Sequence, residues 1–261
     1  MTEQEIKEAI CDVGHKLWQL GFVAANDGNI SARLPDGNFI TTPTGTSKAM
    51  LRPEMLIKMN ADNEVVEPAQ LPGYKPTSEF KVHLRCYAAR PEVNAVVHAH
   101  PPTATGFAIA HIPLDDYTMP EAIIFLGSVP IAPYDTPGSV GVADSIVPFL
   151  ENHDTILMEN HGALMTSADG IMRTVDMLEM MENAAQSALI AGQMAVSLLL
   201  LVAAGLFLRA LDRGRRVDLG FDPSNVAVTS FLLGTSGYDA AKGRLFNRAL
   251  RERMAQTPGV A

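Results

Sequence analysis

Three histidines have the residue type and spacing of a metal-binding site. His98 and His100 lie two positions apart in the β-branched run 95–100, and residues two apart in a strand project from the same face. His161 stands beside a glycine in the apolar segment 156–163, a second predicted strand. Three neutral imidazoles can bind Zn²⁺ and leave one coordination position open, as catalytic zinc sites do. The pattern therefore predicts a catalytic zinc centre.

Glu79 is the best candidate for an accompanying carboxylate. It stands at the start of a predicted helix over 78–89, where Thr77 or Ser78 is the expected N-cap. On spacing alone, the better-supported interpretation is that Glu79 only favours the helix dipole, at about 0.3–1 kcal/mol. His83, one turn further on, could pair with Glu79. We otherwise interpret four histidines as structural or surface residues: His15, His83, His111 and His153.

Three short segments could hold an anion. They are the glycine turn 27–31, the Thr-Pro-Thr-Gly-Thr turn 42–46, and the helix start at Thr77 and Ser78. Backbone N–H groups at helix starts and tight glycine turns bind phosphate, helped by hydroxyl and amide side chains. Each segment alone is typical of an ordinary turn or cap. Beside a metal centre, they suggest a phosphate site.

Alternating helices and strands must position these residues. Apolar spacing predicts helices over 3–20, 78–89, 142–150 and 169–185, and short β-rich runs predict strands over 39–42, 56–59 and 95–100. Interleaved elements of this kind indicate a layered α/β domain.

Composition narrows the partners and the compartment. The net charge of -9 in 261 residues offers no clustered cations for a nucleic-acid backbone, so we expect no nucleic acid partner. Two cysteines, Cys11 and Cys86, are too few for a disulfide framework and fit a reducing compartment. The acidic start lacks the pattern of a secretory signal, which predicts a cytoplasmic catalytic domain.

Five motifs, in order, resemble the class II aldolase/adducin family, and most nearly its fuculose-phosphate aldolases. They are Gly-Asn-Ile-Ser-Ala-Arg at 28–33, Thr-Pro-Thr-Gly at 42–45, Ser-Glu at 78–79, His-Ala-His at 98–100 and Asn-His-Gly at 160–162. The resemblance covers about residues 1–185. It implies a three-layer α/β/α fold around a mixed sheet, a zinc cofactor, a small phosphorylated sugar as substrate, and a homotetramer with sites between subunits.

The resemblance also implies residue roles. The zinc ligands would be His98, His100 and His161, and Glu79 would both contact zinc and move protons. Zinc would act as a Lewis acid that stabilises an enediolate of the substrate. The implied phosphate-binding positions are Asn29, Thr44, Gly45 and Ser78, with Gly28 and Thr77 beside them.

Two further candidates are less well matched. Glu121 is either a second acid/base group or a surface carboxylate. Tyr117 lies two residues before Met119, near which the family's tyrosine is expected, so its assignment as a proton donor needs a shift in register.

The same fold serves several functions, so it does not fix the reaction. We expect an aldehyde-lyase that cleaves or forms a C–C bond in a phosphorylated ketose. The alternatives are a sugar-phosphate epimerase, dehydratase or decarboxylase, and a non-catalytic adducin-like assembly domain. Glu79 stands where the epimerase branch would have an aspartate, which favours an aldolase or decarboxylase.

The C-terminal part differs in composition. No charged residue occurs from 183 to 208, and such a helix would span roughly 30–40 Å, enough to cross a bilayer. We therefore predict a catalytic domain over 1–187, a candidate transmembrane helix over 188–208 that could tether it, and a short α+β fragment over 209–261. The competing interpretation of 188–208 is a buried helix, because Gln186, Gln193 and Ser197 interrupt the apolar run.

Residues 188–261 resemble a fragment of a macrolide-exporter-type ABC transporter permease, which would imply a fused or chimeric gene and a transport component. Four arginines follow the apolar run: Arg209, Arg213, Arg215 and Arg216. Positive charge there conflicts with a permease-like topology.

Overall fold

The computed structural model describes residues 1–115, 119–217, 220, 226 and 228–259. An eight-stranded sheet forms its centre, in the order β4-β3-β2-β1-β5-β8-β7-β6. The strands are β1 (Asn29–Arg33), β2 (Phe39–Thr41), β3 (Ile57–Met59), β4 (Val65–Glu67), β5 (Ala95–Ala99), β6 (Ile131–Ala132), β7 (Thr155–Met158) and β8 (Gly162–Ser167). Only the β6–β7 pair is parallel among these strands. The sheet is therefore mixed, as predicted.

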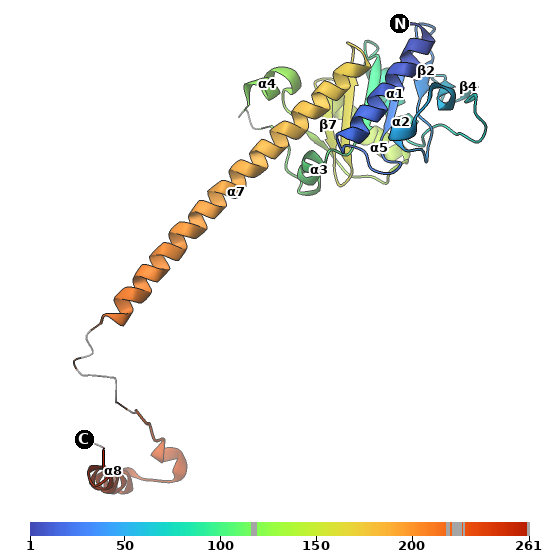
Figure 1. Cartoon of the computed structure of the whole chain (residues 1–261). Coiled ribbons are helices and arrows are strands. Elements are labelled where there is room, and N and C mark those ends of the chain that lie inside the picture. Colours follow the sequence, from blue (N-terminus) through green and yellow to red (C-terminus); the bar gives the residue numbers. More distant parts are fainter. Residues whose placement is uncertain (116–118, 218–219, 221–225, 227, 260–261) are drawn as a thin grey trace. The chain divides into compact units, whose positions relative to one another are not determined.

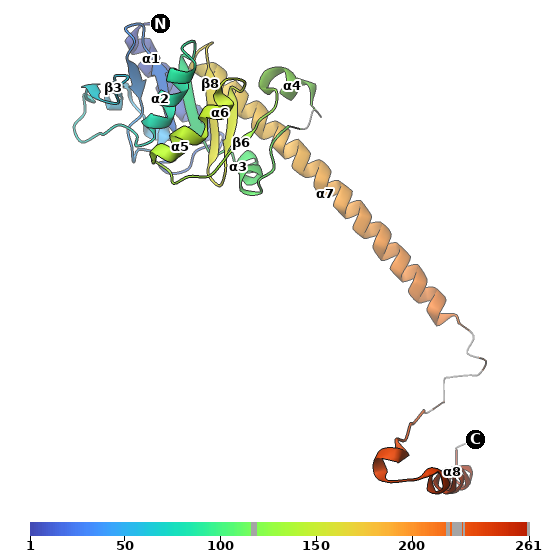
Figure 2. The ribbon, with the colours of Figure 1, turned by 180° about the vertical axis from the view of Figure 1, so that it is seen from behind.

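Helices cover both faces of the sheet (Figures 1 and 2). One core joins alternate strand residues such as Val97 to α1 (Glu3–Gln19), α3 (Pro102–Ile109) and the start of α7 (Ile171–Arg215). The other core joins residues such as Val96 to α2 (Phe80–Ala89), α5 (Val140–Ser145) and α6 (Val147–Leu150). Because adjacent strand residues face opposite sides, one sheet supports both cores. This confirms the three-layer α/β/α fold.

Two helix boundaries differ from the sequence prediction. Helix α2 begins at Phe80 with Glu79 at the N-cap, so neither Thr77 nor Ser78 caps it. Instead, the Glu79 N–H donates to Thr77 Oγ1 at 3.3 Å. The helix expected over 142–150 is split between α5 and α6, where Pro148 stands in the first turn of α6 and cannot continue a preceding helix.

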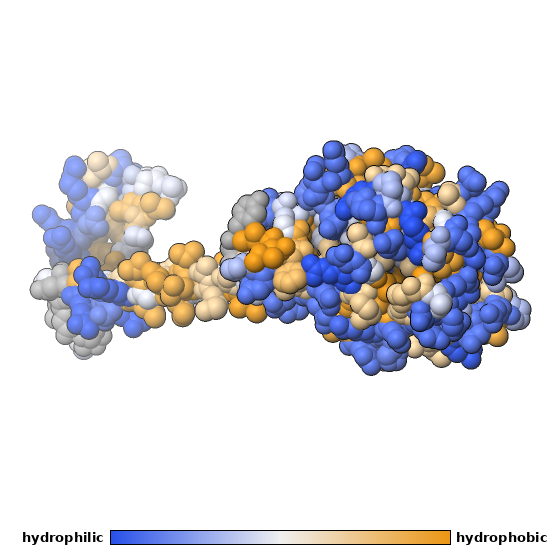
Figure 3. Space-filling model, turned by 90° about the horizontal axis from the view of Figure 1, so that it is seen from above, coloured by the Kyte–Doolittle hydropathy of each residue, from blue (hydrophilic) through white to orange (hydrophobic). Residues whose placement is uncertain are grey.

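Helix α7 is longer than the 169–185 prediction and runs without a break from Ile171 to Arg215. Its buried side chains end at Ala185. From Leu189 to Leu208 its exposed side chains are mostly apolar, and Figure 3 shows apolar side chains gathered along it. The chain divides into two compact units, Met1–Leu199 and Leu200–Ala261, with the division inside this helix.

The remaining described elements are short or helical. Within the first unit these are α4 (Pro120–Leu126) and the 3-10 turns η1 (Lys48–Met50) and η2 (Pro53–Met55). In the second unit they are η4 (Leu233–Ser236) and α8 (Ala240–Ala255). The α+β fragment expected over 209–261 thus contains helices but no strand in its described part.

Candidate metal centre

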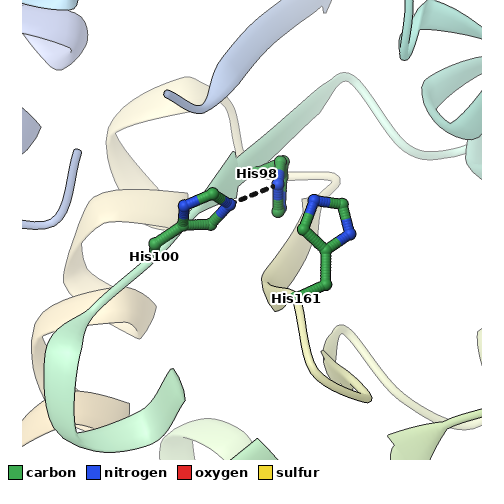
Figure 4. Close-up of side chains that lie close together, drawn as sticks. All are labelled: His98, His100 and His161. Atoms are coloured by element: carbon green, nitrogen blue, oxygen red, sulfur yellow. Dashed lines mark hydrogen bonds between the residues drawn. The ribbon is translucent and has the colours of Figure 1, made fainter. Parts of the chain in front are cut away.

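The three histidines converge at one end of the sheet (Figure 4). His98 lies near the end of β5, His100 follows that strand, and His161 lies in the turn between β7 and β8. One ring nitrogen from each histidine lies within 4.8 Å of the others. The His98 and His100 Nε2 atoms are 2.9 Å apart. The pairing of β5 with β8 and of β8 with β7 brings the three together.

The turn that carries His161 depends on two unusual residues. Asn160 adopts a positive φ of 55°, a conformation that asparagine tolerates better than most residues. Gly162 lies very close to β5. A Cβ added there would collide with the His100 ring, and it would lie 2.7 Å from the Ala99 carbonyl oxygen and 3.1 Å from His98 Cε1. The glycine therefore makes the space in which the histidines pack.

The charge state and ring orientation of the histidines suit a divalent metal. His98 donates from Nδ1 to the Ala163 carbonyl oxygen at 2.9 Å, and the Asp27 carboxylate lies 3.5 Å from His100 Nδ1. Both contacts leave Nε2 facing the centre, as metal-ligating histidines require. Burial lowers the pKa of His98 well below its ordinary value and also lowers the pKa of His161. Neutral imidazole is the form that binds metal.

Glu79 lies beside the triad. Its two carboxylate oxygens are each 3.6 Å from an Nε2 atom, one in His98 and the other in His161. The Asn29 side-chain amide donates to the carboxylate at 2.7 Å. The carboxylate is therefore close enough to join a metal's ligands after a small movement, and it also borders the space that a substrate would occupy.

A buried hydrogen-bond chain leads away from Glu79. His83 Nε2 and Asn29 Oδ1 are 2.5 Å apart, His83 Nδ1 and Ser31 Oγ are 2.6 Å apart, and Ser31 Oγ contacts the Tyr87 hydroxyl at 2.8 Å. Burial lowers the pKa of His83 to about 3, so the ring is neutral. Since the Asn29 amide nitrogen faces Glu79, its oxygen accepts from His83 Nε2–H. Among the described residues, His83 thus reaches Glu79 only through Asn29, and the predicted direct pairing of His83 with Glu79 is wrong.

All six predicted anion-binding residues line one pocket of about 200 Å³ with the three histidines and Glu79. They are Gly28, Asn29, Thr44, Gly45, Thr77 and Ser78. At Gly28, where φ is 72°, a Cβ would lie 2.6 Å from Val23 Cγ1 and 2.8 Å from the His98 carbonyl oxygen. The first glycine turn can therefore press against the strand that carries His98.

The other two candidates, Glu121 and Tyr117, have different outcomes. Glu121 is an exposed residue in the first turn of α4 and does not line this pocket. Tyr117 lies outside the described residues. The sequence prediction missed Asp27 as the partner of His100, because an aspartate in a glycine turn is also typical of an ordinary turn.

Comparison with known proteins identifies the family. The model of the class II aldolase and adducin N-terminal domain matches residues 8–189. The chain therefore belongs to the class II aldolase/adducin family, as the motifs predicted.

Its relatives include enzymes of two reaction types. A 3-oxo-tetronate 4-phosphate decarboxylase of Escherichia coli strain K12 is 30% identical over 73% of this chain and 89% of its own length. A 5-deoxy-D-ribulose 1-phosphate aldolase of Bacillus thuringiensis is 32% identical over 71% of this chain and 85% of its own. Among solved structures, YgbL of Klebsiella pneumoniae is 27% identical, covers 74% of this chain and 92% of its own, and superposes with a TM-score of 0.67.

The family match ends at residue 189, and these comparisons give no support to a permease origin for residues 188–261. A transport function accordingly has no basis beyond the apolar helix itself.

Proposed function

We propose that this chain is a metal-dependent lyase that breaks a C–C bond beside a carbonyl group in a small phosphorylated sugar or sugar acid. One observation carries the proposal: a single pocket is lined by three histidines whose ring nitrogens converge, by a carboxylate and by the three turns predicted to bind an anion. A phosphate held by the turns would place the rest of a short substrate against Glu79.

The site's residues divide the chemical work. The backbone of the turns, with Asn29 and Ser78, would hold the phosphate. A zinc ion held by His98, His100 and His161 would supply Lewis-acid stabilisation of negative charge on the substrate's oxygens. When the C–C bond breaks, its electron pair moves toward the neighbouring carbonyl group, and Glu79 is placed to deliver a proton to the carbon that is left.

The relatives favour decarboxylation as the reaction to test first. Several are decarboxylases of a 3-oxo sugar acid phosphate, and the E. coli enzyme aligns over 89% of its length. Aldol cleavage, which the sequence favoured, is the second candidate because an aldolase relative is 32% identical. The first reaction releases CO₂, whereas the second requires removal of a hydroxyl proton and releases an aldehyde.

Product analysis of the full-length, zinc-loaded chain distinguishes these reactions. We would supply 3-oxo-tetronate 4-phosphate and a panel of ketose 1-phosphates, and measure CO₂ and aldehyde separately. We expect CO₂ from the sugar acid, with turnover lowered about 10²- to 10⁴-fold in Glu79→Gln because the acid/base group is lost. Zinc-loaded protein that releases neither product would contradict the proposed lyase function.

We further propose that α7 attaches the catalytic unit to the cytoplasmic face of a membrane. An 18-residue window of this helix has a mean hydropathy of 2.3 and none of it is buried. Flotation of the full chain with phosphatidylcholine vesicles tests this, with the double substitution Leu200→Arg and Leu201→Arg as the control. We expect only the unsubstituted chain to float, and equal recovery of both would contradict attachment through this helix.

The proposed assembly is a homotetramer, by analogy with the family. Sedimentation in detergent tests it, and a monomeric active enzyme would contradict shared sites.

A further inference from the structure

Lys48 is a buried cation behind the anion pocket. Lys48 is only 1% exposed. Its ammonium group donates to the carbonyl oxygens of Asn26, at 3.2 Å, and Thr46, at 2.9 Å. These carbonyls belong to the two loops that present Gly28, Asn29, Thr44 and Gly45 to the pocket. Lys48 therefore joins the first and second anion-binding turns from behind.

The charge of Lys48 lacks a bonded counterion. Throughout the described residues, no carboxylate lies within ion-pair distance of its ammonium group. Burying an ammonium ion without a paired anion is unfavourable. Burial accordingly lowers the pKa of Lys48 to about 8, although the more distant carboxylates of Asp27 and Glu79 oppose the shift.

Metal binding would weaken the favourable effect of the Asp27 and Glu79 charges on Lys48. Glu79 lies 3.6 Å from two of the histidine nitrogens and Asp27 lies 3.5 Å from the third ring, so a divalent ion at the centre would offset both carboxylates. Among the described residues, only these two carboxylates act on Lys48, so the remaining source of negative charge is then whatever occupies the pocket between the two loops. A phosphate dianion has the charge and the hydrogen-bond acceptors to fill that role.

We propose that Lys48 is a positioning residue of the substrate-phosphate site: it fixes both anion-binding turns and supplies the buried positive charge that selects a dianionic ligand. The inference rests on the proposed function, because it takes the lined pocket as the substrate-phosphate site. Lys48 acts through the loop backbone and through its field, since its hydrogen bonds are to the loop carbonyls.

A direct test follows the protonation of Lys48 with and without sulfate, a tetrahedral dianion that does not itself titrate near pH 8. In the full chain labelled with ¹³Cε-lysine, one resonance should titrate near pH 8, and sulfate should move its midpoint upward. The titratable groups near Lys48 are Asp27, Glu79 and His15, whose ring contacts the Ala49 carbonyl oxygen, so the same titration in a His15→Gln variant separates the histidine's effect from the lysine's own. A midpoint that ignores saturating sulfate would overturn the proposal.

Substitution provides the second readout. We expect Lys48→Met to weaken sulfate binding at least about tenfold, with Lys48→Gln as a second neutral variant that retains a donor for the loops. Lys58→Met is the control, because Lys58 is also a lysine of low exposure, at 8%, but its ammonium group pairs with Glu3 and Asp36 and does not contact the two anion-binding turns. Unchanged sulfate affinity in folded Lys48 variants refutes the role of Lys48 but leaves the anion pocket standing. If the unsubstituted chain binds no sulfate, the anion pocket of the proposed function fails and this inference with it.

Discussion

Gly162→Ala should disable the metal centre through a single added methyl group. Its Cβ would lie 2.7 Å from the Ala99 carbonyl oxygen and 3.1 Å from His98 Cε1, besides colliding with the His100 ring. Real Cβ atoms essentially never lie within 3.0 Å of such neighbours. The Ala99 oxygen belongs to the backbone of β5, which pairs with β8 through Ala99 and Ala163, so it cannot move aside as a side chain can. The two strands must therefore separate by several tenths of an ångström.

That separation moves His98 and His100 together, away from His161. Loss of correct ligand orientation typically weakens metal affinity about 10- to 100-fold, and we expect a loss of that size for zinc in Gly162→Ala. Competition with a chromogenic chelator measures it, and urea unfolding of the metal-free protein checks that the fold survives.

Gly106→Ala is the matched control. Gly106 lies in α3, where an added Cβ meets no atom within 4 Å, and alanine in a helix is favoured over glycine by roughly 1 kcal/mol. We expect unchanged zinc affinity in this variant. The steric account of the site would be refuted by a folded Gly162→Ala protein that binds zinc as tightly as the control.

Three further predictions concern buried groups. His83→Asn, which removes the donor to Asn29, should lower turnover about tenfold more than His83→Gln, whose longer amide can still donate there; equal turnover in the two variants argues against the hydrogen-bond chain. Burial raises the pKa of the half-buried Cys11 and the fully buried Cys86 to about 12, so at pH 8 Cys11 should react slowly with a thiol reagent and Cys86 should not react until urea unfolds the chain. Burial raises the pKa of Glu182, but the backbone N–H groups at the start of α3 donate to its carboxylate and lower that pKa below 4.5 overall. The ionised carboxylate therefore stabilises the fold fully above pH 4.5, and this stabilisation is lost as the pH falls. Glu182→Gln should reduce the loss of stability on the acid side.

Much of the site could be predicted because its signals are local. The two-residue strand period places His98 and His100 on one side, and the glycine turns mark the anion-binding loops. The position of Glu79 near a helix start was also correct within one or two residues, although the N-cap was not.

Groups that reach the site through tertiary contacts have no such signal. Lys48 lies close in sequence to Thr46 but 22 residues after Asn26, the other loop residue that it contacts, and His83 lies 54 residues after Asn29. Residue type alone places a lysine at the surface more often than in a core. Only the packing of the folded chain shows that both side chains are enclosed.

The length of α7 shows a different limit. Apolar spacing identified its buried face up to 185, and composition identified the uncharged stretch beyond it. The sequence divided these into two elements, but the helix is continuous across the predicted boundary at 187 and 188. It contains no proline, and its glycines do not interrupt the backbone hydrogen bonds enough to end it. The domain boundary itself stays a prediction.

Zinc content and product formation measured on one full-length preparation test the central claim most directly. We predict one zinc per chain and C–C bond cleavage in a phosphorylated substrate, with both lost when His98 and His100 are replaced by alanine. Stoichiometric product from protein that holds no metal, or from the double variant, would contradict the account.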